Sequence, residues 1–182
     1  AFPESLDTFI EDVKRCRPTV FISVPRLWAM FRIKIHEKLP QKKLALLLKI
    51  PLISGLIKSK LQKGLGLDQA RVLGCGSAPV APALLEWYHS IGIEITEAWG
   101  MTENGAVTLI QLDDPDERAF TTDGYPLPGV ELKVIDFDGS TLPPGEAGKL
   151  MVRSVSNFGG YLKRPQWNGT DAEGWFDTGD LA

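Results

Sequence analysis

The chain has 182 residues, of which 43% are hydrophobic and 24% are charged. These values are close to the averages of folded soluble domains, which argues against a disordered chain. The sequence contains two cysteines, Cys16 and Cys75, without the spacing of metal ligands. This pattern favours a reducing cytoplasm over a secreted disulfide framework.

The net charge of −3 is unevenly distributed along the chain. Residues 1–66 hold 13 of the 20 Lys and Arg residues but only 5 of the 23 Asp and Glu residues. A basic segment of this kind is typical of solvated helix faces, or of a protein that contacts an anionic membrane or an acidic partner. Nucleic-acid binding is not predicted, because no basic run is interleaved with aromatic residues.

The first predicted elements alternate between helix and strand. Apolar residues at helical spacing, beginning with Leu6, predict a helix over residues 4–17 that ends at Pro18. Residues 19–24 are continuously apolar, as in strands that are buried on both faces of a parallel sheet. A second helix is predicted over residues 25–39.

Residues 44–57 are apolar almost throughout, and lysines bracket them. The lysines are Lys42, Lys43, Lys58, Lys60 and Lys63. The run is shorter than a bilayer span, which needs about 20 apolar residues, and Pro51 would break a single helix. Two interpretations remain open: a helical pair that packs on a core or lines a substrate tunnel, or an interfacial patch over residues 42–63 that contacts a membrane.

The next segment has the pattern of a parallel sheet. Strands are expected at residues 71–73 and 93–96, with a tight loop at 74–79 and a helix at 82–91 between them. Strands that alternate with a helix in this way pair in parallel.

The C-terminal part loses the helical period. Strands are expected at residues 106–112, 130–135 and 148–154, separated by turns rich in proline and glycine. The predicted fold class is therefore α/β. A partial parallel sheet with flanking helices occupies residues 1–112, and a small antiparallel β-rich subdomain, a distorted barrel, occupies residues 113–182.

The most informative segment is residues 97–103, Glu-Ala-Trp-Gly-Met-Thr-Glu. An aromatic ring offers a face to a purine, and a glycine permits close approach of the backbone. A threonine hydroxyl can donate to a phosphate oxygen, and a carboxylate can hold Mg²⁺. Taken alone, a strand that ends in an ordinary turn would explain the same residues.

Three further segments bear on the interpretation of residues 97–103. They are residues 74–79 (Gly-Cys-Gly-Ser-Ala-Pro), 124–131 (Gly-Tyr-Pro-Leu-Pro-Gly-Val-Glu) and 174–180 (Gly-Trp-Phe-Asp-Thr-Gly-Asp). Taken singly, they are a plain turn, a proline-stiffened turn before a strand, and a β-hairpin with an exposed acid.

In this order the four segments resemble the adenylate-forming superfamily of acyl-CoA synthetases, adenylation domains and luciferases. Residues 97–103 resemble its Tyr-Gly-x-Thr-Glu motif, with Trp99 in place of the tyrosine. Residues 17–28, Arg-Pro-Thr-Val-Phe-Ile-Ser-Val-Pro-Arg-Leu-Trp, resemble the bacterial long-chain fatty acyl-CoA synthetase branch. The resemblance implies that ATP and a fatty acid form acyl-AMP and pyrophosphate, with Mg²⁺, and that the acyl group then passes to CoA.

The resemblance also implies a set of site residues. Those expected to line the adenine are Ser77, Ala78, Pro79, Glu97, Ala98, Trp99, Gly100 and Met101. Thr102 would touch the α-phosphate and Glu103 would bind Mg²⁺, and these two residues are expected to act in catalysis. The carboxylate of Asp180 would accept hydrogen bonds from the ribose hydroxyls.

Two departures from the family pattern affect what we expect. Trp99 keeps a stacking face but lacks the tyrosine hydroxyl. The lysine-bearing phosphate loop would precede Ala1, and the hinge and small C-terminal domain would follow Ala182. We therefore expect an internal piece of the large N-terminal domain of a cytoplasmic ligase, inactive by itself.

Other functions share the nucleotide segments. A peptide-synthetase adenylation domain or an aryl-CoA ligase is one alternative, and a non-catalytic module that keeps the fold is another. The apolar run at 44–57 and the segment Val24–Trp28 favour the fatty-acyl branch.

Overall fold

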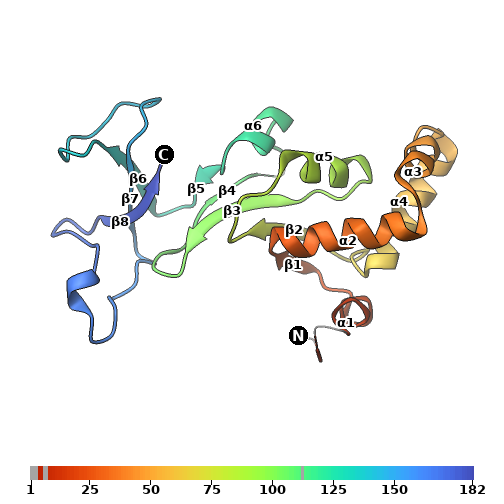
Figure 1. Cartoon of the computed structure of the whole chain (residues 1–182), viewed down its shortest axis with the longest axis horizontal. Coiled ribbons are helices and arrows are strands. Elements are labelled where there is room, and N and C mark those ends of the chain that lie inside the picture. Colours follow the sequence, from red (N-terminus) through yellow and green to blue (C-terminus); the bar gives the residue numbers. More distant parts are fainter. Residues whose placement is uncertain (1–3, 6–7, 112) are drawn as a thin grey trace. The chain divides into compact units, whose positions relative to one another are not determined.

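The structure is a computed structural model that describes residues 4–5, 8–111 and 113–182 (Figure 1). Its backbone divides into two compact units. The first, here called the helical unit, comprises residues 1–97 and 111–122, and the second, the β unit, comprises residues 98–110 and 123–182. Leu6, the first residue of the predicted apolar pattern, lies outside the described residues.

The helical unit carries the helices and the first strands. Its elements are α1 (Phe9–Cys16), β1 (Val20–Ser23), α2 (Pro25–Lys38), α3 (Gln41–Leu48), α4 (Pro51–Leu65), β2 (Val72–Gly76), α5 (Pro82–Ser90) and α6 (Asp116–Thr121). Proline occupies the first turn of α2, α4 and α5, where its missing N–H costs no helical hydrogen bond. The predicted helices at 25–39 and 82–91 are confirmed, and the first helix is shorter than predicted.

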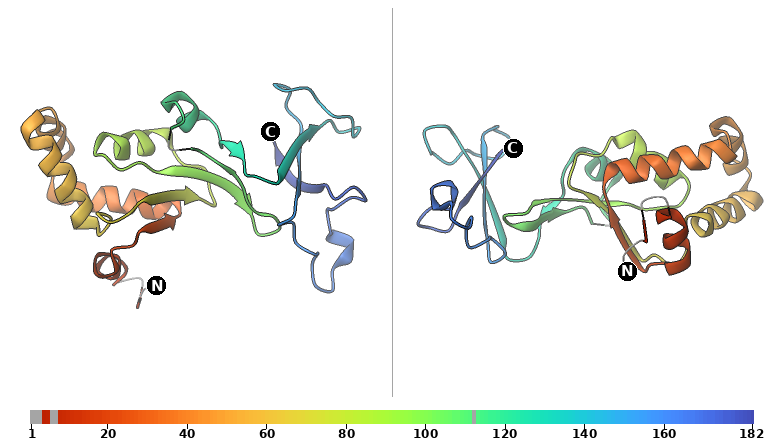
Figure 2. Two further views of the ribbon diagram at one scale, coloured as in Figure 1. Left: turned by 180° about the vertical axis from the view of Figure 1, so that it is seen from behind. Right: turned by 60° about the horizontal axis from the view of Figure 1, so that its bottom comes forward.

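Residues 44–57 form parts of two helices, because Pro51 begins α4 after α3 has ended. Figure 2 shows this pair beyond the C-terminal end of α2. Leu44 is buried, but Leu52 and Leu56 are 89% and 72% exposed. Burial in a core or tunnel wall therefore describes only part of this run. No helix in the described part of the chain is long and apolar enough to cross a membrane.

The first sheet has the strand order β1-β2-β3-β4-β5, with β3 at Thr96–Met101, β4 at Gly105–Leu109 and β5 at Tyr125–Pro126. Strands β1 and β2 pair in parallel, as predicted. Strands β3, β4 and β5 pair antiparallel, so the antiparallel part begins within the first sheet. A tight turn after Met101 reverses the chain, and adjacent strands joined by a tight turn must run antiparallel.

The boundaries of two strands differ from prediction. The strand expected at 93–96 begins at Thr96 and continues to Met101, so that most of segment 97–103 is itself strand. The strand expected at 71–73 extends to Gly76, which places half of the predicted loop in β2. The small residues in these two segments have a weak strand preference, so the sequence pattern did not predict strand there. Hydrogen bonding between β3 and β4 determines where β3 ends.

The prediction that residues 19–24 are buried on both faces is wrong. Strand β1 lies at the edge of the sheet, and Val20 and Ile22 are 56% and 68% exposed. Phe21 points to the opposite face, where its ring packs edge-on against Trp28. The helices of the unit cover that face, and alternate side chains of a strand point to opposite faces.

The core of the helical unit forms around two aromatic side chains. Trp28 of α2 and Tyr88 of α5 are fully buried, with ring centroids 5.1 Å apart. The hydroxyl of Tyr88 donates to the carbonyl oxygen of Trp28 at 2.6 Å, and the indole N–H of Trp28 donates to the carbonyl oxygen of Gly74 at 3.2 Å. These bonds join both helices to the end of β2, from which the loop at 77–79 leaves.

The β unit contains the second sheet, with strands β6 (Val130–Ile135), β7 (Lys149–Ser154) and β8 (Phe176–Leu181) in that order. All pairs are antiparallel, and a short 3₁₀ helix, Pro165–Trp167, precedes β8. The strands predicted at 130–135 and 148–154 are confirmed. The predicted α/β fold class with a smaller antiparallel sheet is observed.

Gly66 ends α4 with a left-handed backbone, φ +75°. A Cβ there would overlap the Cα of Lys14 and lie 2.7 Å from the carbonyl oxygen of Val13. We expect Gly66→Ala to lower the free energy of unfolding by about 2–3 kcal/mol. Gly64→Ala, in open space within α4, should raise it by about 0.5–1 kcal/mol. Urea unfolding of both variants measures the two changes in the free energy of unfolding. Changes of equal sign would contradict the crowded, left-handed position of Gly66.

Candidate functional site

The loop after β2 contains residues 77–79 and is anchored to β3. Ser77 has a left-handed backbone, φ +66°, which is unfavourable for a residue with a Cβ and is often found at functional sites. The backbone N–H of Val80 donates to Oε1 of Glu97 at 3.2 Å. This bond attaches the loop to Glu97, the first residue of segment 97–103.

Cys75 lies directly before this loop and is fully buried. Burial, followed by the nearby Glu97 carboxylate, raises the pKa of its thiol to about 11. The thiol is therefore protonated at neutral pH and a poor nucleophile. Its position is explained by packing.

Residues 98–103 lie in the β unit, on the β3–β4 hairpin. Gly100 faces Ala106 across the hairpin, and the register shifts between Trp99 and Gly100. A Cβ on Gly100 would overlap the carbonyl oxygen of Gly105. Gly100 therefore permits the close approach of the β4 backbone.

The turn after Met101 presents Thr102 and Glu103. Thr102 is exposed and Glu103 is half-buried, whereas Asn104 is fully buried. The side-chain oxygen of Asn104 accepts a hydrogen bond from the backbone N–H of Met101 at 3.3 Å. This bond closes the turn, so that Thr102 and Glu103 remain at its tip.

A second segment of the β unit, residues 156–161, holds this turn. The hydroxyl of Ser156 donates to the carbonyl oxygen of Asn104 at 2.7 Å, and the N–H of Phe158 donates to the carbonyl oxygen of Glu103 at 2.6 Å. The hydroxyl of Tyr161 donates to Oε1 of Glu103 at 2.5 Å. Hydrogen bonds therefore fix both the backbone and the side-chain carboxylate of Glu103.

Sequence reasoning missed the roles of Asn104 and Tyr161. The available signal for Tyr161 was the dipeptide Gly160-Tyr161, but nothing in the sequence shows that it lies beside a residue 58 positions earlier.

The hydrogen bond to Glu103, then partial burial and the negative charge of Glu103, raise the pKa of Tyr161. We expect the pKa of the Tyr161 phenol to lie above the ordinary tyrosine range. The measurement is the ultraviolet absorbance change with pH of the chain, minus that of Tyr161→Phe. In a Glu103→Gln background the pKa of Tyr161 should fall, because the neutral amide repels the phenolate less. The stability that the raised pKa contributes is complete below the unfolded tyrosine pKa and is lost as pH rises through the folded value. An unchanged phenol titration in Glu103→Gln would contradict the contact.

Asp180 lies on β8 and is exposed. Its backbone N–H donates to the hydroxyl of Thr178 at 3.0 Å, and that hydroxyl donates to the carbonyl oxygen of Leu150 at 2.8 Å. Gly179, between them, has φ +75°. These contacts fix the backbone at Asp180 and leave its carboxylate toward solvent.

The predicted site residues are divided between the two units. Ser77, Ala78, Pro79 and Glu97 belong to the helical unit; Ala98, Trp99, Gly100, Met101, Thr102, Glu103 and Asp180 belong to the β unit. Trp99 is half-buried. Among the described residues, no group of three or more His, Cys, Asp or Glu side chains is placed to hold a metal ion.

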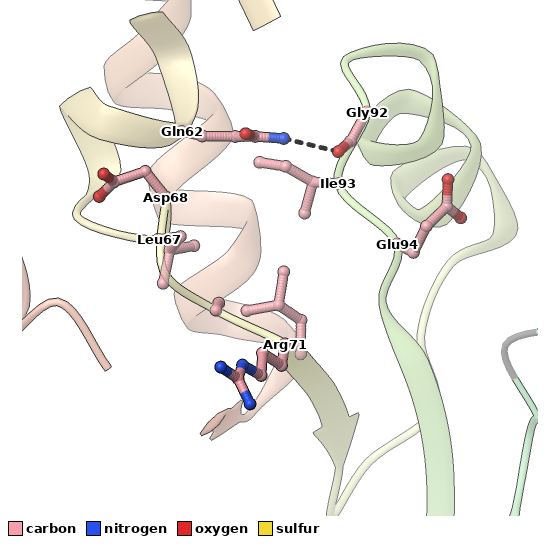
Figure 3. Close-up of a pocket in the computed structure, with 9 residues that line it drawn as sticks. Gln62, Leu67, Asp68, Arg71, Gly92, Ile93 and Glu94 are labelled. Carbon is pink, nitrogen blue, oxygen red and sulfur yellow. Dashed lines mark hydrogen bonds between the residues drawn. The ribbon is translucent and has the colours of Figure 1, made fainter. Parts of the chain in front are cut away.

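Figure 3 shows a pocket of about 250 Å³ within the helical unit. Gln62 crosses its upper side and donates to the carbonyl oxygen of Gly92 at 2.7 Å, while Arg71 lies at its lower side. Arg71 directly precedes β2, so the pocket lies at the amino end of that strand. Ligands of open α/β sheets bind at the carboxyl ends of the strands, which here means the loop at 77–79. We therefore separate this pocket from the candidate site.

The model of the AMP-binding enzyme family matches residues 1–162 of the chain. The match includes segments 74–79 and 97–103. The chain belongs to the AMP-binding enzyme family.

Relatives of this family member differ in their named functions. The chain is 36% identical over 117 residues to the medium-chain fatty-acid–CoA ligase of Escherichia coli K12, covering 63% of this chain and 21% of that protein. It is 44% identical over 119 residues to enterobactin synthase component E of the same organism, covering 63% and 22%. The chain thus spans about a fifth of the length of these relatives.

Solved structures of the family share the fold. ATP-bound MatB from Rhodopseudomonas palustris superimposes with a TM-score of 0.67 at 26% identity, covering 97% of this chain and 30% of that one. The α/β fold with its smaller antiparallel sheet is therefore the fold of a segment of an AMP-binding enzyme.

Proposed function

We propose that the chain is part of an ATP-dependent long-chain fatty acid–CoA ligase. The observation that carries the proposal is the turn at residues 102–104, which residues 156–161 hold so that Thr102 and Glu103 stand at its tip. The likeness to a fatty-acid–CoA ligase supports the fatty-acid substrate. In this proposal, residues 1–112 and 113–182 are subdomains of one large N-terminal domain.

The proposed reaction has two steps. A carboxylate oxygen of the fatty acid attacks the α-phosphorus of ATP, and the bond to pyrophosphate breaks to leave acyl-AMP. The sulfur of CoA then attacks the acyl carbonyl carbon, AMP leaves with the electron pair of the acyl–oxygen bond, and the thiol proton is released to solvent. Both steps concentrate negative charge near the α-phosphate, where fixed donors and cations lower the barrier.

The resemblance to the family assigns the proposed contacts with adenosine residue by residue. Trp99, with Ala98 and Gly100 beside it, would stack on the adenine, and Met101 would lie next along the strand. The backbone of Ser77, Ala78 and Pro79 would line the other face of the ring. Glu97 would contact the adenine amino group while it accepts from Val80, since a carboxylate has several acceptor positions. Asp180 would accept from the ribose hydroxyls.

Thr102 and Glu103 would act at the phosphates. The exposed hydroxyl of Thr102 would donate to an α-phosphate oxygen. Glu103 fits a Mg²⁺ ligand, because its carboxylate is fixed by Tyr161 and Mg²⁺ in such sites takes one or two carboxylates together with substrate phosphates. When bound, Mg²⁺ would neutralise charge that develops on the α-phosphate and on the departing pyrophosphate.

The substrate proposal is tested by fatty-acid-dependent exchange between ATP and pyrophosphate. A ligase that contains this chain is expected to be most active with long-chain fatty acids and inactive with hydroxybenzoates and amino acids. Preference for an aryl or amino acid would favour the aryl-CoA ligase or peptide-synthetase alternative. The 182-residue chain itself is expected to show no exchange, because it carries only part of the proposed site.

A non-catalytic module that keeps the fold is the second candidate. It predicts that adenosine leaves the backbone amide resonances of residues 97–103 unchanged in an NMR titration of the chain. Shifts confined to these residues and to 77–79 would support the nucleotide site. The titration needs no turnover, so it separates binding from catalysis.

We also propose that the ligase is cytoplasmic and contacts the membrane surface peripherally through residues 42–63. Lysines bracket the apolar run of this segment, which is a composition found in interfacial helices.

A further inference from the structure

The tip of the α3–α4 hairpin exposes an aliphatic surface in the helical unit. Its exposed members, here called the hairpin tip, are Leu46, Ile50, Leu52, Ile53 and Leu56. Leu52 and Leu56 are one helical turn apart on α4 and are the most exposed of the five. Contiguous exposed aliphatic side chains of this kind mark an interaction surface.

The same hairpin is anchored from its other side. Leu44 of α3 is 2% exposed, and Leu48, Ile57 and Leu61 pack against the core of the unit. Each helix therefore has one face on the core and a second apolar face in solvent. The core packing holds the hairpin in place, so the exposed leucines can bind a partner without unfolding.

The charges around the hairpin tip all have one sign. Residues 38–67 contain seven lysines and no aspartate or glutamate. The lysines are Lys38, Lys42, Lys43, Lys49, Lys58, Lys60 and Lys63. Among the described residues none of them forms an ion pair. Lys38 lies close enough to Glu11 for its charge to lower the pKa of that carboxyl, so the other six lysines carry the argument.

We infer that the hairpin tip inserts into the headgroup region of an anionic bilayer, with the lysines on the lipid phosphates. The inference narrows the proposed membrane contact to defined side chains and depends on no catalytic residue. Lysine stems can lie along apolar chains while the ammonium group stays at the phosphate level.

Two other occupants fit the surface less well. A second copy of the chain would bring two lysine-rich faces together, and like charges oppose that contact. A protein partner is usually held by tyrosine, tryptophan or arginine anchors, whereas the hairpin tip offers only leucine and isoleucine.

The test is co-sedimentation of the chain with vesicles of phosphatidylcholine that contain or lack phosphatidylglycerol. We expect binding only to the anionic vesicles, weakened by high salt because exposed charges are screened. The double variant Leu52→Ser, Leu56→Ser should lose most of the binding. The double variant Lys42→Glu, Lys43→Glu should weaken it at least tenfold, because each lysine near an anionic surface contributes about a fivefold factor.

Val155→Ser is the matched control, because Val155 of the β unit is 98% exposed and its removal should leave binding unchanged. Circular dichroism verifies that each variant is folded. The inference is overturned if the chain stays in the supernatant, if the leucine variant binds as well as the unchanged chain, or if the longer ligase does not bind. Concentration-dependent self-association that the leucine variant abolishes would instead assign the surface to a second copy. Vesicle binding requires no turnover, so failure here leaves the ligase proposal standing.

Discussion

In the proposed ligase, Glu103→Gln is expected to slow acyl-adenylate formation about 10²–10³-fold, which is the effect of removing one group that stabilises transition-state charge. Glutamine keeps an oxygen that can accept from the Tyr161 hydroxyl, so the turn should stay in place. The free energy of unfolding should therefore change by less than about 1 kcal/mol. The loss follows from the charge that a Mg²⁺ ligand requires.

The measurement is fatty-acid-dependent exchange between ATP and pyrophosphate over a range of Mg²⁺ concentrations. The variant should need more Mg²⁺ for half-maximal rate, which a purely structural defect would not produce. Glu146→Gln, which removes an exposed carboxylate from a loop of the β unit, is the control and should retain the rate. An unchanged Mg²⁺ requirement in Glu103→Gln would remove Glu103 from the metal site.

Gly100→Ala is expected to lower the free energy of unfolding of the chain by about 3 kcal/mol or more. A methyl group there overlaps the carbonyl oxygen of Gly105 and lies 2.9 Å from the Cα of Ala106. Both neighbours are backbone, which cannot rotate away as a side chain can, so the strands must separate. Trp99 and Thr102, on either side, would move with them.

Gly55→Ala is the matched substitution, because a Cβ at Gly55 of α4 meets no atom within 4 Å. It should stabilise the chain slightly, since alanine favours a helix interior. Urea unfolding monitored by circular dichroism gives both values. A small effect of Gly100→Ala would show that the hairpin relaxes around the added methyl group, and would contradict the close approach of β4.

Several features of the fold were predictable because they depend on local chemistry. Prolines that begin helices, and turns rich in proline and glycine between strands, act over a few neighbours. They predicted α2, α5, β6 and β7. Segment 97–103 was recognisable from the order of its side chains. The strand that carries it was not, because its small residues have weak strand preference and only pairing with β4 stabilises it.

The exposure of apolar segments was not predictable from pattern. Residues 19–24 and 44–57 are both largely apolar. Hydrophobicity indicated burial for the first and left both burial and a membrane-facing patch open for the second. Burial depends on which elements cover a face, and that is a property of the sheet order and of helix packing. Ile22 and Leu52 are therefore exposed, while Leu44 is buried.

The sequence by itself determined which residues could bind a nucleotide, since the order of aromatic, hydroxyl and carboxylate side chains is a local property. Only the tertiary structure decided how two of them are held. Glu97 accepts from Val80, and Glu103 accepts from Tyr161, 58 residues further along the chain. The tertiary structure also assigned Gly100 to the approach of a neighbouring strand. Contacts between distant residues arise from packing, and no local pattern encodes their geometry.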